Sequence, residues 1–175
     1  MVRLDARGFG RSTVPPPGYP WSLGGFARDI GLLLDHLGLD KVHLVGETVG
    51  GTIAMRFAAD YPDRLRSLTL CSSRFRFTEP FHSEFARKVE KEGVLGWARS
   101  TMARRLDSSQ VDPGLVSWYT SEMGKSSKHV VLEALMALVG HDLSDMLRQI
   151  SVPTLILSAE NRSDYSADYM REMHE

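Results

Sequence analysis

The residues from Gly46 to Gly50 form a short pattern that could carry out acyl-transfer chemistry. They read Gly-Glu-Thr-Val-Gly, with the hydroxyl side chain of Thr48 at the centre. The apolar run Val42–Val45 precedes the pattern, and a helix-like segment with small residues follows it. In a tight strand-to-helix turn, flanking glycines relieve crowding and the central side chain projects at the carboxyl end of the strand. The pattern predicts a hydroxyl nucleophile, with threonine where serine is the usual residue.

The two neighbours of Thr48 differ in whether they could stabilise the negative charge of an oxyanion at such a site. Val49 is the first residue after the nucleophile position, so its backbone N–H can donate to an oxyanion, with the N-terminus of a helix behind it. We expect Glu47 to shape the pocket or the oxyanion side. We do not expect it to act as a base, because adjacent residues of such a turn point apart.

The surrounding segments predict alternating strands and helices. Ser22 is a suitable N-cap for a helix that Gly38 ends, and its apolar positions recur at helical spacing: Phe26, Ile30, Leu33, Leu34 and Leu37. A second helix follows the Thr48 turn and stops at Tyr61-Pro62. Leu65–Leu70 reads as a further strand. Alternation at this spacing implies parallel strands joined by right-handed crossovers.

Four segments follow one another in an order that is typical of a known family: DARGFGRS (5–12), VHLVGETVGG (42–51), YPDR (61–64) and VPTLIL (152–157). A single Gly-x-x-x-Gly pattern is a weak signal, whereas this ordered set is specific. Together the segments resemble the α/β-hydrolase superfamily, and within it the esterase, enol-lactonase and cofactor-free haloperoxidase branch.

The resemblance implies an α/β fold in which a remnant parallel sheet is flanked by helices and carries a helical lid insert. Core strands are expected near 42–45, 65–70 and 154–157. The core would comprise residues 1–73 and 151–175, and the lid residues 74–150. Helices are expected in the lid over 84–92, 94–106, 114–123, 130–139 and 143–150. Four lid side chains are candidates to line a pocket, or else to form the lid's own core: Trp97, Trp118, Tyr119 and Met136.

The same resemblance implies a chain truncated at both ends. The family's first three strands would precede Asp5, and its last strand and catalytic histidine would follow Glu175. Val2–Leu4 would then be the end of the fourth strand, separated from Val42–Val45 by one missing strand. We expect a three-stranded parallel core with an exposed edge, an uncovered apolar face and marginal stability.

The resemblance leaves the catalytic triad incomplete. Thr48 occupies the nucleophile position, either as a working nucleophile or as a degenerate one, because a β-branched side chain adds crowding in a strained turn. Ungapped matching places Arg162 at the acid position, and Asp164 nearby is the weaker candidate for the acid, or else a solvated loop residue. None of the six histidines matches the family's base: His36, His43, His82, His129, His141 and His174.

Composition excludes several classes of partner. The 21 basic and 22 acidic residues give a net charge of −1, which offers no case for nucleic acid or an anionic membrane. Cys71 is the single cysteine, so no intrachain disulfide or Cys-rich metal site is possible. No apolar run is long enough to cross a bilayer. We expect a cytoplasmic protein with a small-molecule substrate and neither metal nor cofactor; its oligomeric state is not predicted.

The leading hypothesis is that the full-length parent hydrolyses a small ester or lactone by nucleophilic acyl transfer, and that this chain alone is inactive. The haloalkane-dehalogenase branch is disfavoured, because it needs an aspartate at position 48. Two alternatives stay open. One is a non-catalytic α/β-hydrolase-like protein in which Thr48 lines a ligand pocket, and the other is an inactive fragment.

Overall fold

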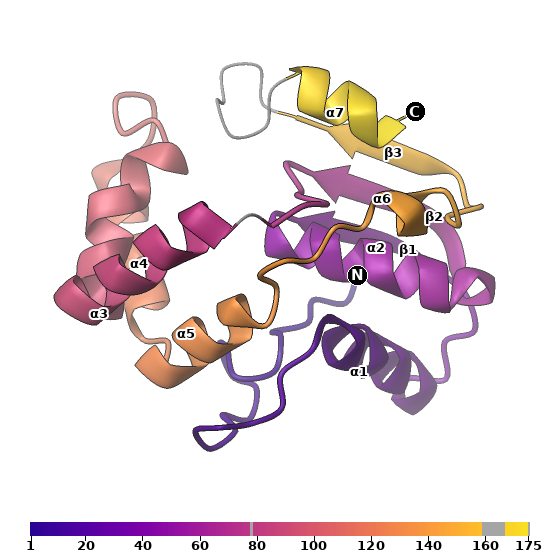
Figure 1. Ribbon diagram of the computed structural model, residues 1–175, viewed down its shortest axis with the longest axis horizontal. Coiled ribbons are helices and arrows are strands. Elements are labelled where there is room, and N and C mark those ends of the chain that lie inside the picture. The colour runs from indigo at the N-terminus through magenta and orange to yellow at the C-terminus, as the bar shows by residue number, and fades with distance from the viewer. Residues whose placement is uncertain (78, 159–166, 175) are drawn as a thin grey trace. The chain divides into compact units, whose positions relative to one another are not determined.

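The computed structural model describes residues 1–77, 79–158 and 167–174. Its contacts divide the chain into two compact units (Figure 1). The helical unit comprises Met1–Trp21 and Glu79–Val139, and the sheet unit comprises Ser22–Thr78 and Gly140–Glu175. In this grouping residues 1–21 accompany the helices of the predicted lid. The division into a core of 1–73 and 151–175 with a lid of 74–150 stays a prediction about the complete fold.

A small parallel sheet organises the sheet unit. Its strands are β1 (Val42–Glu47), β2 (Leu65–Cys71) and β3 (Thr154–Leu157), in the spatial order β1-β2-β3. Both neighbouring pairs are parallel, with Gly46 opposite Leu70 and Leu70 opposite Ile156. The predicted partial α/β fold, its three core strands and their order are therefore confirmed. The carboxyl ends of all three strands lie at one edge of the sheet, where the Thr48 turn begins.

Helix α1 (Leu23–His36) begins and ends as the sequence predicts. The Ser22 hydroxyl accepts the Gly25 N–H at 3.0 Å, which satisfies one of the free donors of the first turn. Gly38 has φ = 63°, a conformation that glycine adopts without steric cost. The Leu39 N–H reaches back to the Leu34 carbonyl at 2.9 Å, as in a Schellman ending.

Helix α2 (Val49–Asp60) covers one face of the sheet. It packs against β1, β2 and α1, and a short 3₁₀ turn (Pro62–Arg64) follows it. Leu68 and Leu70 of β2 are at most 1% exposed, and Met55 and Phe57 of α2 are fully buried. Successive residues of a strand point to opposite faces, so Leu68 and Leu70 share the covered face.

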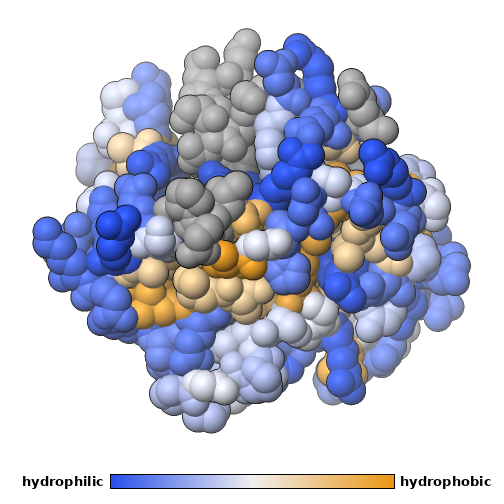
Figure 2. All heavy atoms as spheres, viewed as in Figure 1, coloured by the Kyte–Doolittle hydropathy of each residue, from blue (hydrophilic) through white to orange (hydrophobic). Residues whose placement is uncertain are grey.

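The opposite face of the sheet is open. Val45 is 66% exposed, Leu155 53% and Leu157 46%. These residues share one face, because Val45 pairs with Thr69, which pairs with Leu155, while Cys71 pairs with Leu157. On the side of the molecule drawn in Figure 2, apolar side chains show among mainly hydrophilic ones.

The helical unit is built on a small apolar core. Its elements are α3 (Glu79–Thr101), a 3₁₀ turn (Met102–Arg104), α4 (Pro113–Gly124) and α5 (Lys128–Met136). Gly93 interrupts α3 with φ = 69° and ψ = 172°, which agrees with the predicted separate helices over 84–92 and 94–106. The buried cluster consists of Phe85, Val89, Val94 and Val131. Two short helices belong to the sheet unit, α6 (Ser144–Leu147) and α7 (Ala167–His174).

The prediction that Val2–Leu4 is a strand end is wrong. Residues 1–6 have no regular secondary structure, and Val2 and Leu4 are 57% and 45% exposed. A strand forms only where its backbone finds a neighbouring strand to hydrogen-bond, and the three-stranded sheet does not include this segment. What is ordered nearby is a turn, in which the Asp5 carboxylate accepts the Arg11 N–H at 3.0 Å.

None of the helices in the described ranges combines the length and apolar character that crossing a bilayer requires.

Candidate functional site

Thr48 lies in a strained turn between β1 and α2. Its backbone has φ = 49° and ψ = −118°, a region that a β-branched residue rarely enters. β1 ends at Glu47 and α2 begins at Val49, so the turn occupies a single residue. The side chain is partly buried and makes no capping hydrogen bond to the helix. The predicted strand, turn and positive φ are all confirmed.

Close backbone packing surrounds the turn. The Thr48 N–H donates to the Cys71 carbonyl at 2.9 Å, which joins the turn to the end of β2. A Cβ atom on Gly46 would lie 2.6 Å from the Gly50 oxygen, and one on Gly51 would lie 1.7 Å from Ser73 Oγ. Nothing lies within 4 Å of the equivalent position on Gly50. Gly46 and Gly51, and not Gly50, therefore allow β1, α2 and the exit of β2 to meet.

Val49 and Glu47 flank Thr48 with different chemistry. As the first residue of α2, Val49 has no carbonyl one turn earlier in the helix to bind its N–H, so this donor is available to an anion at the helix N-terminus. Glu47 is exposed, on the open face of the sheet with Cys71 and Leu157.

The remaining triad candidates are not brought to Thr48 by described contacts. Asp164 lies outside the described residues, so its assignment as the acid stays a prediction. Two histidines are held elsewhere. His43 Nδ1 lies 2.7 Å from Ser67 Oγ, and His129 Nε2 lies 2.9 Å from the Pro15 carbonyl oxygen. His36 lies in α1, while His141 and His174 are exposed.

The four aromatic and methionine candidates all belong to the helical unit. Trp97 packs against the buried cluster, with its ring 5.0 Å from that of Phe85. Trp118 is 59% exposed, Met136 is 41% exposed, and Trp118 stacks on Tyr119 with centroids 6.5 Å apart. Packing against the cluster gives Trp97 a structural role whatever else it contacts. The pocket-lining role of these four residues stays a prediction.

Comparison with known proteins identifies the family. The family model described as alpha/beta hydrolase fold matches residues 1–110, which is more than half of the chain. The chain belongs to the alpha/beta hydrolase family. The matched region contains β1, the Thr48 turn, α2 and β2, so the family assignment includes the part of the molecule that forms the candidate site.

Three relatives show the range of similar proteins. An AB hydrolase superfamily protein from Bacillus subtilis, YisY, is 26% identical over 99% of this chain and 68% of its own length. An enol-lactonase from Burkholderia xenovorans superimposes with a TM-score of 0.87 at 22% identity, covering 96% of this chain and 65% of that one. A thermophilic esterase from Thermogutta terrifontis gives 0.81 at 32% identity, covering 96% and 64%. The chain thus spans about two thirds of the length of these three proteins.

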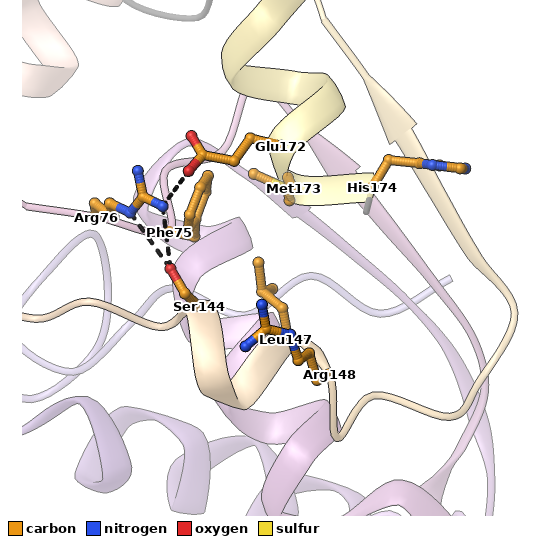
Figure 3. Close-up of a pocket in the computed structure, with 8 residues that line it drawn as sticks. All are labelled: Phe75, Arg76, Ser144, Leu147, Arg148, Glu172, Met173 and His174. Atoms are coloured by element: carbon orange, nitrogen blue, oxygen red, sulfur yellow. Dashed lines mark hydrogen bonds and ion pairs between the residues drawn. The ribbon is translucent and has the colours of Figure 1, made fainter.

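A second feature of the sheet unit is a small cavity that does not include Thr48 in its lining. Its volume is about 150 Å³, and its walls come from the segment after β2, from α6 and from α7. Figure 3 shows the Arg76 side chain directed toward Glu172 and Ser144, while His174 extends away from them. Phe75 and Met173 supply apolar surface.

The charges beside this cavity are already paired. The Arg76 guanidinium binds Glu172 and lies 3.3 Å from an Asp142 carboxylate oxygen. The Glu172 hydrogen bond raises the pKa of Arg76, and hydrogen bonds from Ser144 lower the pKa of Asp142. The cluster joins the exit of β2 to α6 and α7, and its arginine offers no unpaired charge for an anionic substrate.

Sequence reasoning missed two buried polar residues near the Thr48 turn, Ser73 just after β2 and Thr52 within α2. Ser73 is 1% exposed, and its hydroxyl donates to the Cys71 carbonyl at 3.1 Å. Thr52 is fully buried. A polar residue just after an apolar strand, such as Ser73, reads as a loop in the sequence. Thr52 reads as an ordinary helical residue, because its bond to the Arg74 carbonyl, 22 positions away, leaves no local signal.

Proposed function

We propose that the protein containing this chain hydrolyses a small carboxylic ester or lactone by acyl transfer, with Thr48 as the nucleophile. The observation that carries the proposal is the backbone of Thr48, held at φ = 49° where a parallel strand ends and a helix begins. Strained residues of this kind concentrate at functional sites. Esterases and an enol-lactonase are among the structures that share the fold, which supports this reaction class.

In the proposed reaction, Thr48 Oγ1 attacks the acyl carbon while a base takes its proton. The carbonyl oxygen becomes an oxyanion, toward which the Val49 N–H donates; one such donor contributes about 10²–10³-fold to the rate. The C–O bond to the alcohol then breaks, and the alcohol leaves with the proton. A water molecule then attacks the acyl carbon while the base takes its proton. The bond to Thr48 Oγ1 breaks, the carboxylic acid is released, and the proton returns to the Thr48 hydroxyl. We assign Asp164 as the candidate acid and assign no histidine of this chain as the base.

The test uses the longest natural open reading frame that contains this sequence, with p-nitrophenyl acetate as substrate. Thr48→Ala should lower turnover by about three orders of magnitude, while Thr48→Ser should retain or raise it. Thr120→Ala is the control, because Thr120 lies in α4 and its hydroxyl donates to the Val116 carbonyl of the same helix. Wild-type turnover in Thr48→Ala would rule out Thr48 as the nucleophile.

The 175-residue chain alone should show no triad-dependent turnover, because no histidine of this chain is assigned as the base that would take the proton of the nucleophile. Thr48→Ser should not restore turnover for the same reason. Intact-mass measurement after mixing with the ester checks this directly. A stoichiometric burst of acyl-enzyme from the purified Thr48→Ser chain would contradict the expectation.

A second candidate is a non-catalytic ligand-binding protein. It is favoured by the β-branched side chain of Thr48, whose χ1 is restricted in a turn where serine would rotate more freely. In that case the longer protein would bind an ester or lactone without hydrolysing it. Calorimetric binding together with no acyl adduct, in both the wild type and Thr48→Ser, would support this candidate over the enzyme.

A further inference from the structure

The exit of β2 forms a second strained turn beside the Thr48 turn. Among the described residues, Thr48 and Ser72 are the only non-glycine residues with positive φ, at 49° and 44°. The Ser72 N–H donates to the Leu157 carbonyl at 2.8 Å, much as the Thr48 N–H donates to that of Cys71. Each turn is thus tied to the end of the next strand, and two strained turns stand side by side at the carboxyl edge of the sheet.

Thr52 connects these two turns. Its hydroxyl donates to the Arg74 carbonyl at 2.6 Å and lies 3.5 Å from the Thr48 carbonyl oxygen, which is too long for a strong bond. The side chain is fully buried. One turn into α2, Thr52 therefore binds the segment that leaves β2, and the strength of this contact lies in the bond to Arg74.

Other buried helical threonines of the chain behave differently. The Thr101 hydroxyl donates to the Trp97 carbonyl at 2.7 Å, and the Thr120 hydroxyl donates to the Val116 carbonyl at 2.7 Å. Both bonds are to the residue four positions earlier, the usual choice of a threonine inside a helix. The equivalent local contact of Thr52, to the Thr48 carbonyl, is long at 3.5 Å, and its short bond goes to the Arg74 carbonyl 22 residues away.

Three contacts then clamp the start of α2 against the exit of β2. The Thr48 N–H binds Cys71, Gly51 packs against Ser73, and the Thr52 hydroxyl binds Arg74. A strained backbone persists only where its surroundings over-determine it. Without the third contact, the first turn of α2 could shift and let Thr48 relax toward ordinary angles.

We propose that Thr52 is a positioning residue for Thr48. Its hydroxyl fixes the first turn of α2 to the β2 exit, which holds the Thr48 turn in its strained conformation and sets the direction of the Val49 N–H. The catalytic meaning of this role rests on the proposed function, whereas the positioning itself is a property of the fold and is measured without substrate.

The experiment compares amide hydrogen exchange in the wild-type chain, Thr52→Val, Thr52→Ser and the matched control Thr120→Val. Thr52→Val keeps the shape of the side chain and removes the donor. The Thr48 amide should then exchange about tenfold faster relative to the Leu68 amide in the middle of β2. Thr52→Ser, which restores the hydroxyl, should return this ratio to near the wild-type value, and Thr120→Val should leave it unchanged.

Uniformly faster exchange of Thr48 and Leu68 would overturn the proposal, because it would show a general loss of stability. An unchanged Thr48 amide in Thr52→Val would overturn it as well. If Thr52→Val does not fold, Thr52→Ala is measured in its place, with the same selective effect expected.

Turnover separates this inference from the proposed function. If Thr52→Val speeds amide exchange selectively at Thr48 and the longer protein hydrolyses no ester, the positioning role of Thr52 is supported and the proposed hydrolase activity is ruled out. Where the longer protein does turn over p-nitrophenyl acetate, Thr52→Val should lower kcat about tenfold and leave KM near its original value, since a displaced nucleophile affects the chemical step.

Discussion

At the scale of single residues, the three glycines around Thr48, which are Gly46, Gly50 and Gly51, differ in how closely the surrounding atoms pack against them. Gly46 and Gly51 stand where any Cβ would meet neighbouring backbone or the Ser73 side chain. Gly50 faces open space. The second glycine of the Gly-x-x-x-Gly pattern is therefore not the one that the fold requires here. The residue after it, Gly51, has that role because α2 lies so close to the exit of β2.

This difference gives a paired prediction. Gly51→Ala should destabilise the chain by about 1–3 kcal/mol, because Ser73 or the backbone must move to admit the methyl group. Gly50→Ala should be neutral or stabilise by up to about 1 kcal/mol, since alanine is the better helix former. Urea unfolding followed by circular dichroism measures both.

A compensating variant sharpens the test. Ser73→Gly in the Gly51→Ala background should recover part of the lost stability, because both Ser73 atoms that would clash are removed. Equal stabilities of Gly50→Ala and Gly51→Ala would contradict the close packing of α2 on the β2 exit.

At the scale of elements, α7 is tied to the sheet by a side chain that accepts hydrogen bonds from the main chain. The Tyr169 hydroxyl oxygen accepts the Phe75 N–H at 2.9 Å and the Arg76 N–H at 3.1 Å. Its ring packs on that of Phe75, with centroids 4.7 Å apart. The contact satisfies two backbone donors just past the end of β2.

Removing that oxygen should be costly. Tyr169→Phe leaves both N–H groups without this acceptor and is expected to destabilise the chain by about 1–3 kcal/mol in urea unfolding. Tyr119→Phe is the matched control, because the Tyr119 hydroxyl takes part in no hydrogen bond among the described residues, and it should change stability by less than about 0.5 kcal/mol. A similar loss in both variants would show that Tyr169 acts only through its ring.

The same hydroxyl predicts a dependence on pH. Burial raises the pKa of Tyr169 above its ordinary value of 10.0, so folding favours the neutral phenol. The stabilising contribution is complete below pH 10 and is lost as the pH rises through the higher pKa of the folded state. The difference in unfolding free energy between the wild type and Tyr169→Phe should therefore shrink from about pH 9 to pH 11. A constant difference across this range would contradict the burial of the hydroxyl.

Elements with local signals were predictable from the sequence, and elements that depend on distant partners were not. Ser22 and Gly38 mark the ends of α1, and glycine-flanked Thr48 marks its own turn, because each acts through its immediate neighbours. Val2–Leu4 was predicted to lie apart from Val42–Val45, and it forms no strand because its backbone has no neighbour in the three-stranded sheet. The roles of Thr52 and Tyr169 were missed because both bind the chain after β2 from far away in sequence.

At the scale of the whole molecule, the unusual feature is a parallel sheet with one open face. Parallel sheets are normally covered on both faces, because their crossover helices lie on each side. Here α2 covers the face of Leu68 and Leu70, while a row formed by Val45, Thr69 and Leu155 crosses the other face. Exposed apolar surface of this kind favours association.

The open face should therefore bind an apolar dye and promote self-association. The double variant Val45→Thr with Leu155→Thr places β-branched threonine, which suits a strand, at both positions and reduces the apolar surface. Dye fluorescence should fall roughly twofold or more, and the dependence of Tm on protein concentration should weaken, because less apolar surface is available for contact between chains.

Leu32→Gln is the control, since Leu32 is 51% exposed in α1 and belongs to no strand. If the control lowers dye binding as much as the double variant does, the dye does not report on the sheet. If the wild-type chain shows a sharp, reversible transition at a Tm independent of concentration, the open face does not drive association.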